Sequence, residues 1–209
     1  MTVRGTFIAF EGGEGAGKST QARLLAEALR TRGIDALVTR EPGGTPGAEA
    51  IRALLLDGPA WGPRAEALLF AAARADHVAR AIVPALDAGR WVICDRFVDS
   101  SRAYQGSAGA LGDDAIIDLH MIGSMGLMPD RTILMEVDPA TAAARIAARD
   151  GDRADNIGGR GTQYHAAVAA AFVEFAEAEP HSFIRIDGNG SAAASHAAIM
   201  AALAPLLPA

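Results

Sequence analysis

Short apolar runs alternate along the chain with longer segments in which apolar residues recur at helical spacing. The short runs are rich in β-branched and aromatic residues and predict buried strands over residues 6–10, 34–39, 90–94, 131–137 and 183–186. The longer segments predict helices over residues 19–32, 48–56, 64–86, 99–106, 113–123, 140–148, 164–177 and 191–207. Strands that alternate with helices are typical of an α/β fold, so we expect a parallel sheet of about five strands with helices on both faces.

A glycine-rich loop joins the first predicted strand to the first predicted helix. Its sequence is Gly12-Gly13-Glu14-Gly15-Ala16-Gly17-Lys18-Ser19, which has the form G-x-x-x-x-G-K-S. Glycines let the backbone curl until successive N–H groups point at one phosphate, and the start of the helix adds its dipole. In this pattern Lys18 reaches the β- and γ-phosphates of a nucleotide and Ser19 ligates Mg²⁺. The order of strand, loop and helix disfavours a chance glycine-rich turn and indicates a P-loop NTPase-type fold.

Charged residues follow two other predicted strands. Ligands of an open parallel sheet bind outside the carboxyl ends of its strands. Arg40 begins the Pro- and Gly-rich segment 40–47, so its guanidinium is placed to grip a second phosphate, although a solvated arginine fits these residues equally well. Asp95 ends the apolar run 90–94 as a Walker B aspartate does, and such a carboxylate holds Mg²⁺ directly or through water. Arg96, next to it, faces the same phosphate site.

Phe70 and Arg74 suggest a nucleobase site. They are four residues apart on one predicted helix, so they share a face. An aromatic ring for stacking beside a fork of hydrogen-bond donors suits a nucleobase. A core aromatic residue beside a surface arginine is the alternative.

Residues 149–163 are polar, glycine-rich and weakly patterned, which indicates a mobile loop. Arg149, Arg153 and Arg160 lie in or beside it. A lid that carries arginines can close over a triphosphate, exclude water and offset transition-state charge. A solvated loop without this role is the alternative.

Length, charge and cysteine content narrow the class of protein. A chain of 209 residues fits one domain, so we expect residues 1–209 to form a single unit. The net charge of −6 argues against a nucleic-acid partner. The single cysteine, Cys94, allows no internal disulfide and suits the cytoplasm. No apolar stretch reaches the roughly 18 residues that span a bilayer, so we expect no membrane partner.

Five blocks of the chain resemble thymidylate kinase, and they fall in the order expected for that family. They are FEGGEGAGKST, TREPGGT, EALLFAAARADHV, VICDRFVDSSRAYQG and PDRTILMEVDP. The likeness covers nearly the whole chain, and its second and fourth blocks are far more specific than a phosphate loop alone. It implies a nucleoside-monophosphate-kinase-like enzyme that uses Mg²⁺ to transfer the γ-phosphoryl group of ATP to dTMP. The products would be dTDP and ADP, on the way to dTTP.

The resemblance also implies roles in binding the base of dTMP. Phe70 would stack on thymine. Arg74 and Gln105 would hydrogen-bond the edge of the base. Ser101 and Arg52 would lie nearby.

Other matches concern the sugar, the phosphates and the metal. Tyr104 would lie under the deoxyribose and crowd out a 2′-hydroxyl, and Glu14 would approach the same sugar. Arg40 and Arg96 would hold the acceptor phosphate. The expected metal ligands are Glu11, Ser19 and Asp95, and the expected ATP-binding residues are Gly12, Gly13, Glu14, Gly15, Ala16, Gly17, Lys18, Ser19 and Thr20.

One residue of the phosphate loop indicates to which group of the family the chain is similar. Some relatives carry an arginine directly after the acidic residue of the phosphate loop, and here that position is Gly15. The loop offers no cation but Lys18, so the lid is expected to supply an arginine, as in the bacterial-type enzymes. The lid segment is more glycine-rich than the usual pattern, which leaves open whether Arg149 or Arg153 acts; Arg160 is a weaker candidate. The expected catalytic residues are therefore Lys18, Asp95, Arg96, Arg149 and Arg153.

Family members commonly form homodimers through long helices, and residues 64–86 are the expected face. The nearest alternative function is another P-loop nucleotide kinase or a deoxynucleoside kinase, against which the arginines placed for an acceptor phosphate argue. A regulatory ATPase acting on a protein partner is the alternative from another class, and it would hydrolyse ATP without a nucleotide acceptor. The N-K-x-D motif with which a GTPase reads its base is absent.

Overall fold

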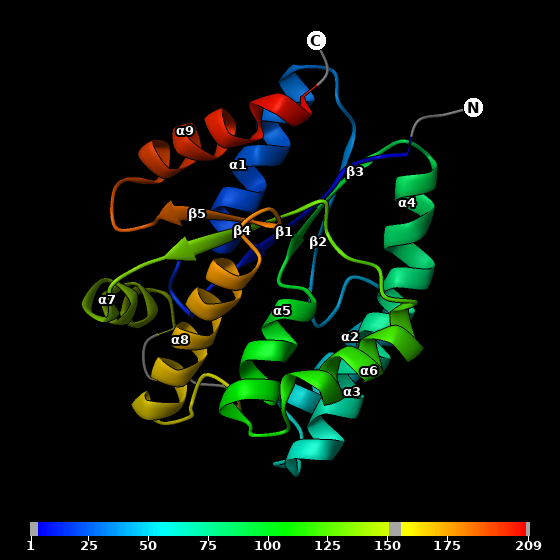
Figure 1. The fold of residues 1–209 in the computed structure, drawn as a ribbon, viewed down its shortest axis with the longest axis vertical. Coiled ribbons are helices and arrows are strands. Elements are labelled where there is room, and N and C mark those ends of the chain that lie inside the picture. Colours follow the sequence, from blue (N-terminus) through cyan, green and yellow to red (C-terminus); the bar gives the residue numbers. More distant parts are fainter. Residues whose placement is uncertain (1–3, 151–155, 208–209) are drawn as a thin grey trace.

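In the computed structural model, which describes residues 4–150 and 156–207, five parallel strands form one sheet in the order β2-β3-β1-β4-β5. The strands are β1 (Phe7–Glu11), β2 (Ala36–Arg40), β3 (Trp91–Asp95), β4 (Arg131–Glu136) and β5 (Phe183–Asp187). Each strand begins and ends within two residues of its predicted range, so the prediction from the apolar runs is confirmed. Figure 1 shows the strands running through the centre of the molecule between the helices.

The helices also follow the predicted segments. They are α1 (Lys18–Thr31), α2 (Pro46–Leu56), α3 (Pro63–His77), α4 (Val83–Asp87), α5 (Val98–Ser101), α6 (Asp113–Ser124), α7 (Pro139–Asp150), α8 (Thr162–Ala178) and α9 (Ala192–Leu203). Two stretches are π-helical, Val78–Ile82 and Arg102–Ala108, and Ala204–Leu206 is a 3₁₀-helix.

The segment predicted as one helix over residues 64–86 is α3 and α4 joined by the π-helical stretch Val78–Ile82. Pro84 lies in the first turn of α4. Proline lacks an N–H, and its ring crowds the carbonyl four residues earlier, so an undisturbed α-helix does not pass through it. The wider π-turns directly before Pro84 accommodate the ring without ending the helix.

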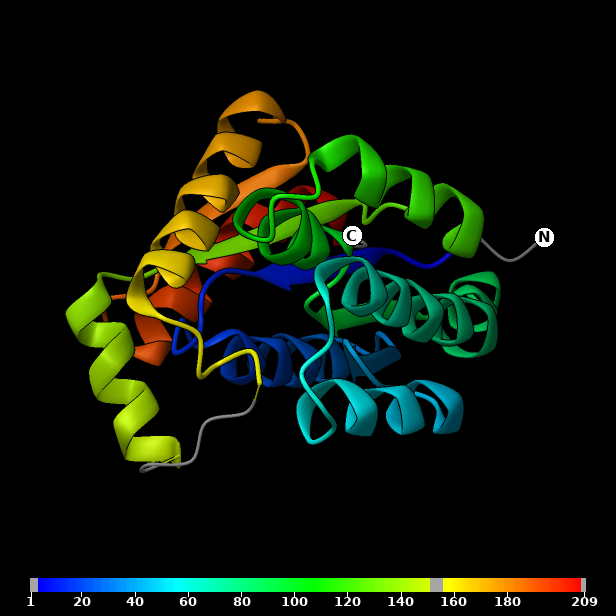
Figure 2. The same ribbon diagram turned by 90° about the horizontal axis from the view of Figure 1, so that it is seen from below.

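Helices cover both faces of the sheet, as predicted. On one face Ile8 and Phe10 of β1 pack with Leu25 and Leu29 of α1 and with Ile199 of α9. Figure 2 shows α1 and α9 on this side of the strands. The alternation of side chains along a strand places the intervening residues on the opposite face.

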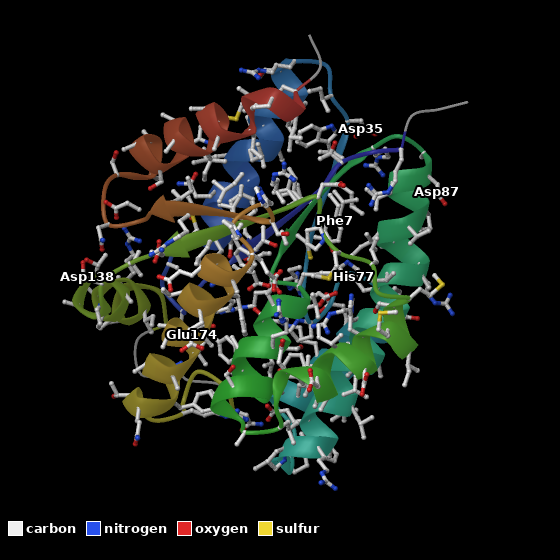
Figure 3. The ribbon with its side chains drawn as sticks, in the orientation of Figure 1. Phe7, Asp35, His77, Asp87, Asp138 and Glu174 are labelled. Atoms are coloured by element: carbon white, nitrogen blue, oxygen red, sulfur yellow. The ribbon has the colours of Figure 1, made fainter. Side chains whose placement is uncertain are left out.

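On that opposite face Phe7 and Ala9 pack against Ile82 and Leu86 and against Phe97. Phe7 lies between the sheet and the α4 region (Figure 3). Farther along the sheet, α8 and the π-helical stretch after α5 cover β4 through a third apolar cluster. The sheet is thus buried on both sides, which accounts for the continuous apolar character of its strands.

The parallel register brings two predicted charged positions to one edge. Arg40 of β2 lies beside Asp95 of β3, and Phe10 of β1 is the partner of Asp95 on the other side. The glycine loop therefore leaves β1 next to the ends of β2 and β3. Among the described residues, no helix combines the length and the apolar character needed to cross a membrane.

Candidate active site

A cavity of about 620 Å³ opens at the carboxyl edge of the sheet. This volume lies in the range of ligand-binding cavities. The phosphate loop, the ends of β2 and β3, and helices α2, α3, α5 and α7 all contribute to its wall. Its lining residues are Glu14, Gly15, Gly17, Lys18, Ser19, Thr20, Arg23, Arg40, Glu41, Pro42, Arg52, Leu56, Phe70, Arg74, Asp95, Arg96, Phe97, Ser100, Ser101, Tyr104, Gln105, Arg145 and Ile157.

The loop needs glycine at two of its positions. Gly12 has φ 134°, and a Cβ there would lie 2.4 Å from the carbonyl oxygen of Met135. Gly15 has φ 72°, and a Cβ there would lie 2.6 Å from the carbonyl oxygen of Ala142 in α7. No other residue fits both the left-handed backbone and the close approach. The absence of an arginine at position 15 thus follows from how tightly α7 packs against the loop.

Lys18 is buried at the start of α1, and its Nζ donates to the carbonyl oxygens of Gly12, at 3.0 Å, and Gly13, at 2.7 Å. Burial, and next the positive charge of Arg96, lower the pKa of Lys18 to about 8. The ammonium thus has neutral hydrogen-bond partners and a cationic neighbour. A negatively charged ligand would favour its protonated form.

Ser19 and Asp95 meet at the edge of the cavity, where the Ser19 hydroxyl donates to the Asp95 carboxylate. The two residues come from α1 and from the end of β3, which is the arrangement expected for a Walker B aspartate. Within residues 4–150 and 156–207, no group of three or more His, Cys, Asp or Glu forms a complete metal site. A hydroxyl and one carboxylate nevertheless suit Mg²⁺, which usually takes one or two protein ligands beside substrate phosphates.

Glu11 ends β1 and is fully buried. Its Oε1 accepts from the backbone N–H groups of Phe97 and Ser100, at 2.7 and 3.0 Å, and its Oε2 accepts from the Ser100 hydroxyl at 2.6 Å. Burial, and next the charge of Asp99, raise the pKa of Glu11 to about 7. Glu11 thus fixes the start of α5, and Ser100 stands in the cavity wall. Direct metal ligation by Glu11 stays a prediction.

Arg96 lines the cavity and has a left-handed backbone with φ 70°. Strained backbone of this kind concentrates at functional sites. Its guanidinium bonds Glu14 at 2.5 Å, the Gly12 carbonyl at 3.2 Å and the Ser100 hydroxyl at 3.0 Å. It also lies over the ring of Tyr104, 5.1 Å from the centroid. Arg96 therefore ties the phosphate loop to the opposite wall.

Arg40 and Arg52 line the same cavity as Lys18. Arg40 donates to both carboxylate oxygens of Glu49 at 3.0 Å, and its side chain is 52% exposed. Arg52 donates to the carbonyl oxygen of Pro42 at 2.7 Å. The predicted position of Arg40 beside the phosphate site is found, although its guanidinium keeps much of its contact with solvent.

The predicted shared face of Phe70 and Arg74 is found, because both side chains line the cavity from α3. Arg74 is only 3% exposed, so the alternative of a surface arginine is wrong. Its Nε donates to Glu41 at 2.7 Å and its Nη2 to the Ser101 hydroxyl at 2.8 Å. Glu41 also pairs at 3.1 Å with Nδ1 of His77, which lies inside the molecule (Figure 3).

Gln105 and Tyr104 complete this end of the cavity. Both are buried on the π-helical stretch Arg102–Ala108. The Tyr104 hydroxyl accepts from Arg96 at 3.3 Å, and Nε2 of Gln105 donates to Glu66 at 2.8 Å. Glu41 and Glu66 could not be found from the sequence, because their hydrogen-bond partners, Arg74 and Gln105, are far from them in the chain.

The segment between α7 and α8 is two residues shorter at each end than the loop predicted over about residues 149–163. Helix α7 continues through Asp150, and α8 begins at Thr162. The alanine-rich sequence before Arg149 favours helix strongly enough to extend it. Arg149 therefore lies in the last turn of α7, and Arg153 lies outside the described residues. Arg160 is described, and it contacts Glu66 and Tyr164.

Arg145 was missed by the sequence analysis, and it lines the cavity from α7. Its guanidinium donates to the carbonyl oxygen of Gly188 at 2.8 Å and to that of Gly15 at 3.4 Å. A cation thus reaches the loop from the neighbouring helix. Its position four residues before Arg149, on the same helix face, was the signal available in the sequence.

A glycine loop with its lysine and serine shares one cavity with a second set of arginines beside an aromatic ring. Together with the five-stranded parallel sheet, this defines a P-loop nucleotide kinase.

Comparison with known proteins identifies the family. The family model described as thymidylate kinase matches residues 10–199. Thymidylate kinase from Rhizorhabdus wittichii is 56% identical over 206 residues, 98% of this chain and 99% of that protein. Thymidylate kinase from a Bradyrhizobium species is 46% identical over 194 residues, 91% of this chain and 86% of that protein. The crystal structure of thymidylate kinase from Ehrlichia chaffeensis superimposes with a TM-score of 0.79 at 30% identity, covering 96% of this chain and 99% of that one. The chain belongs to the thymidylate kinase family.

Proposed function

We propose that the cavity binds ATP at the loop end and dTMP at the Phe70 end. The γ-phosphoryl group passes between them and gives dTDP and ADP, a step of dTTP biosynthesis. The observation that carries this proposal is the single continuous cavity, which Lys18 lines at one end and Arg74 at the other. Donor and acceptor can therefore meet without leaving the protein.

The donor end comprises the loop residues 12–20 and the side chains around them. Lys18 would turn from the loop carbonyls to the β- and γ-phosphates of ATP. Ser19 and Asp95 would hold Mg²⁺, which would supply positive charge to offset the negative charge of the phosphates. Arg145, whose guanidinium already reaches the carbonyl oxygen of Gly15, joins this end.

The acceptor end would hold dTMP through its base, sugar and phosphate. Phe70 would stack on thymine, and Arg74 and Gln105 would hydrogen-bond its edge. Ser101, which accepts from Arg74 at 2.8 Å, orients that arginine, and Arg52 lines the same cavity.

The sugar and phosphate of dTMP would meet the remaining acceptor residues. Tyr104 would lie against the deoxyribose, and Glu14 would approach the same sugar from the loop. Arg40 and Arg96 would bind the acceptor phosphate, for which the Arg96 guanidinium is already held by four partners.

Phosphoryl transfer asks for alignment and for charge stabilisation more than for covalent chemistry. The acceptor phosphate is a good nucleophile near neutral pH because its second pKa is about 6, so no general base is needed. Lys18 and Arg96 stabilise the charge that develops on the transferred group. An arginine of the lid, Arg149 or Arg153, completes this set.

We also propose a homodimer in the cytoplasm. Leu68 of α3 and Met121 of α6 are exposed, and Ile122 and Met125 are 83% and 80% exposed, although such residues normally avoid solvent. The four lie on or just after two helices that pack together. The single buried cysteine suits a reducing compartment. Sedimentation analysis should find a dimer for the natural chain and a monomer for Ile122→Glu; equal masses for the two would contradict this interface.

A turnover panel over dTMP, dUMP, dCMP, UMP and thymidine tests the proposed reaction. We expect ATP-dependent product with dTMP, slower turnover with the other monophosphates, and none with thymidine. Preferred turnover of thymidine would make the protein a deoxynucleoside kinase. ATP hydrolysis without any acceptor would make it a regulatory ATPase.

A further inference from the structure

The amide of Gln105 is held in one orientation. Gln105 is 2% exposed, and its Nε2 donates to Oε1 of Glu66, which is itself 5% exposed. An ionised carboxylate only accepts hydrogen bonds, so the nitrogen end of the amide must face Glu66. The oxygen end of the same side chain, which lines the cavity, is left for a ligand.

Arg160 holds the second oxygen of Glu66. The Arg160 guanidinium donates to Oε2 of Glu66 and, at 2.6 Å, to the hydroxyl of Tyr164. That hydroxyl donates in turn, at 2.6 Å, to the carbonyl oxygen of Tyr104. Arg160 thus reaches Gln105 through Glu66, and it reaches the backbone directly before Gln105 through Tyr164.

The segment that carries Arg160 also covers the cavity. Asn156 is bound to the end of α2, because its Nδ2 donates to the carbonyl oxygens of Gly58, at 3.0 Å, and Leu55, at 3.3 Å. Ile157, one residue on, lines the cavity. Residues 156–160 therefore form a strap that lies over the acceptor end and holds the Gln105 amide through Arg160.

We propose that Glu66 and Arg160 are positioning residues that make the site selective for bases with an N3–H group. With its oxygen toward the base, Gln105 accepts from the N3–H of thymine or uracil. Cytosine presents an acceptor at N3, which would face the Gln105 oxygen with no proton between them. This inference rests on the proposed function, because it assumes that a pyrimidine monophosphate occupies the acceptor end.

Glu66→Gln should turn the Gln105 amide around. The new side chain has one acceptor oxygen. Because Arg160 can only donate, it bonds that oxygen, and the new amide nitrogen faces Gln105. Gln105 must then present its own oxygen to position 66 and its nitrogen to the base. We expect the kcat/KM preference for dTMP over dCMP to fall about tenfold, the value of one hydrogen bond, with KM for ATP unchanged.

Arg160→Met supplies the sharper readout. Alone it removes the hydrogen bond to Oε2 of Glu66 and keeps the carboxylate oxygen Oε1 that faces Gln105. Gln105 therefore keeps its orientation, and the dTMP preference should fall by no more than about threefold. Combined with Glu66→Gln it frees the amide oxygen at position 66 for Gln105, so the double variant should regain most of the preference that Glu66→Gln lost. A residue that merely maintains the fold would give additive losses instead.

The matched control is Arg30→Met, which removes an arginine whose carboxylate partner, Glu27, lies with it on the exposed side of α1. It should change neither preference nor KM.

An unchanged dTMP to dCMP ratio in Glu66→Gln, or additive losses in the double variant, would overturn the proposal. If Glu66→Gln does not fold, the KM for dTMP decides. It should rise in Arg160→Met, where the Glu66 carboxylate that holds the Gln105 amide loses its own partner, and be largely restored in Arg160→Lys; equal KM values in both variants and in the natural chain count against the proposal. A natural chain that phosphorylates no dTMP would instead overturn the proposed function.

Discussion

The buried charged side chains have different hydrogen-bond partners at the two ends of the cavity: neutral groups at the donor end and oppositely charged groups at the acceptor end. At the donor end the hydrogen-bond partners of Lys18 are neutral carbonyls, and those of Glu11 are neutral donors. Burial shifts the pKa of both toward the uncharged form. At the acceptor end Arg74 is bonded to Glu41, and Arg160 is bonded to Glu66. The acceptor end is complete before its ligand arrives, whereas the donor end needs the charges of ATP and Mg²⁺ to balance it.

Lys18→Met tests this difference most strongly. Because Lys18 stabilises charge on the transferred phosphoryl group, we expect kcat to fall by about 10³-fold or more. The variant also removes a buried ammonium that burial disfavours, so its Tm at pH 7 should equal or exceed that of the natural chain. Steady-state kinetics and thermal unfolding measure the two effects. A large loss of Tm would mean that Lys18 stabilises the fold without ligand, and the comparison between the two ends would break.

The arginines of the lid are expected to act on both ends at once. Removing the one that reaches the transferred group should lower kcat by about 10³-fold, as for arginine fingers. Kinetics of Arg149→Ala, Arg153→Ala and the double variant identify it, and near-normal kcat in all three would contradict a lid arginine. Arg145→Met is the matched variant on α7: it should raise KM for ATP and leave KM for dTMP unchanged, because Arg145 contacts the loop side only.

The donor end could be predicted from sequence because it is local. Lys18, Ser19 and the glycines lie within one short stretch whose flanking strand and helix fix its position. Parallel strands also follow from the alternation of strands and helices, and parallel strands end at one edge of the sheet, so the presence of Arg40, Asp95 and the loop at that edge was within reach.

The hydrogen-bond network of the acceptor end could not be predicted in the same way. Its hydrogen bonds join residues that are far apart in sequence, such as Arg74 with Glu41 and Gln105 with Glu66. An apolar pattern places a helix, but it does not say which buried polar groups will pair. The helical end of the lid was missed for a different reason: local alanine propensity outweighed the polar composition that suggested a loop.

Arg74→Met tests the acceptor end. We expect KM for dTMP to rise about tenfold to 100-fold, because one charged hydrogen-bond donor to the base is lost, while KM for ATP stays the same. Unlike Lys18→Met, it should also lower the free energy of unfolding by about 3–5 kcal/mol, since Glu41 is left buried without its cation. Urea unfolding measures this, and Glu41→Gln should show a similar loss. Stability equal to that of the natural chain would show that the pair is not the completed unit inferred above.

The smallest expected effect is a pH dependence that only the donor end produces. The pKa of Glu11 is raised from 4.5 to about 7, so the native state holds a proton there that the unfolded chain has lost. The stability that Glu11 contributes is therefore full below pH 4.5 and is lost as the pH rises through 7, a change of up to about 3 kcal/mol.

Lys18 works in the opposite direction. Its pKa is lowered from 10.5 to about 8, so its contribution is full above pH 10.5 and is lost as the pH falls through 8. Between pH 7 and 8 both groups are charged at a cost, and the donor end contributes least to the stability of the ligand-free protein. Urea unfolding at pH 5, 6, 7 and 8 should show a steeper fall for the natural chain than for Glu11→Gln, which cannot lose a proton at that position. If the free energy of unfolding falls equally with pH in both proteins, the pH dependence does not come from Glu11. In that case, binding of ATP with Mg²⁺ should leave the pH profile of the natural chain unchanged.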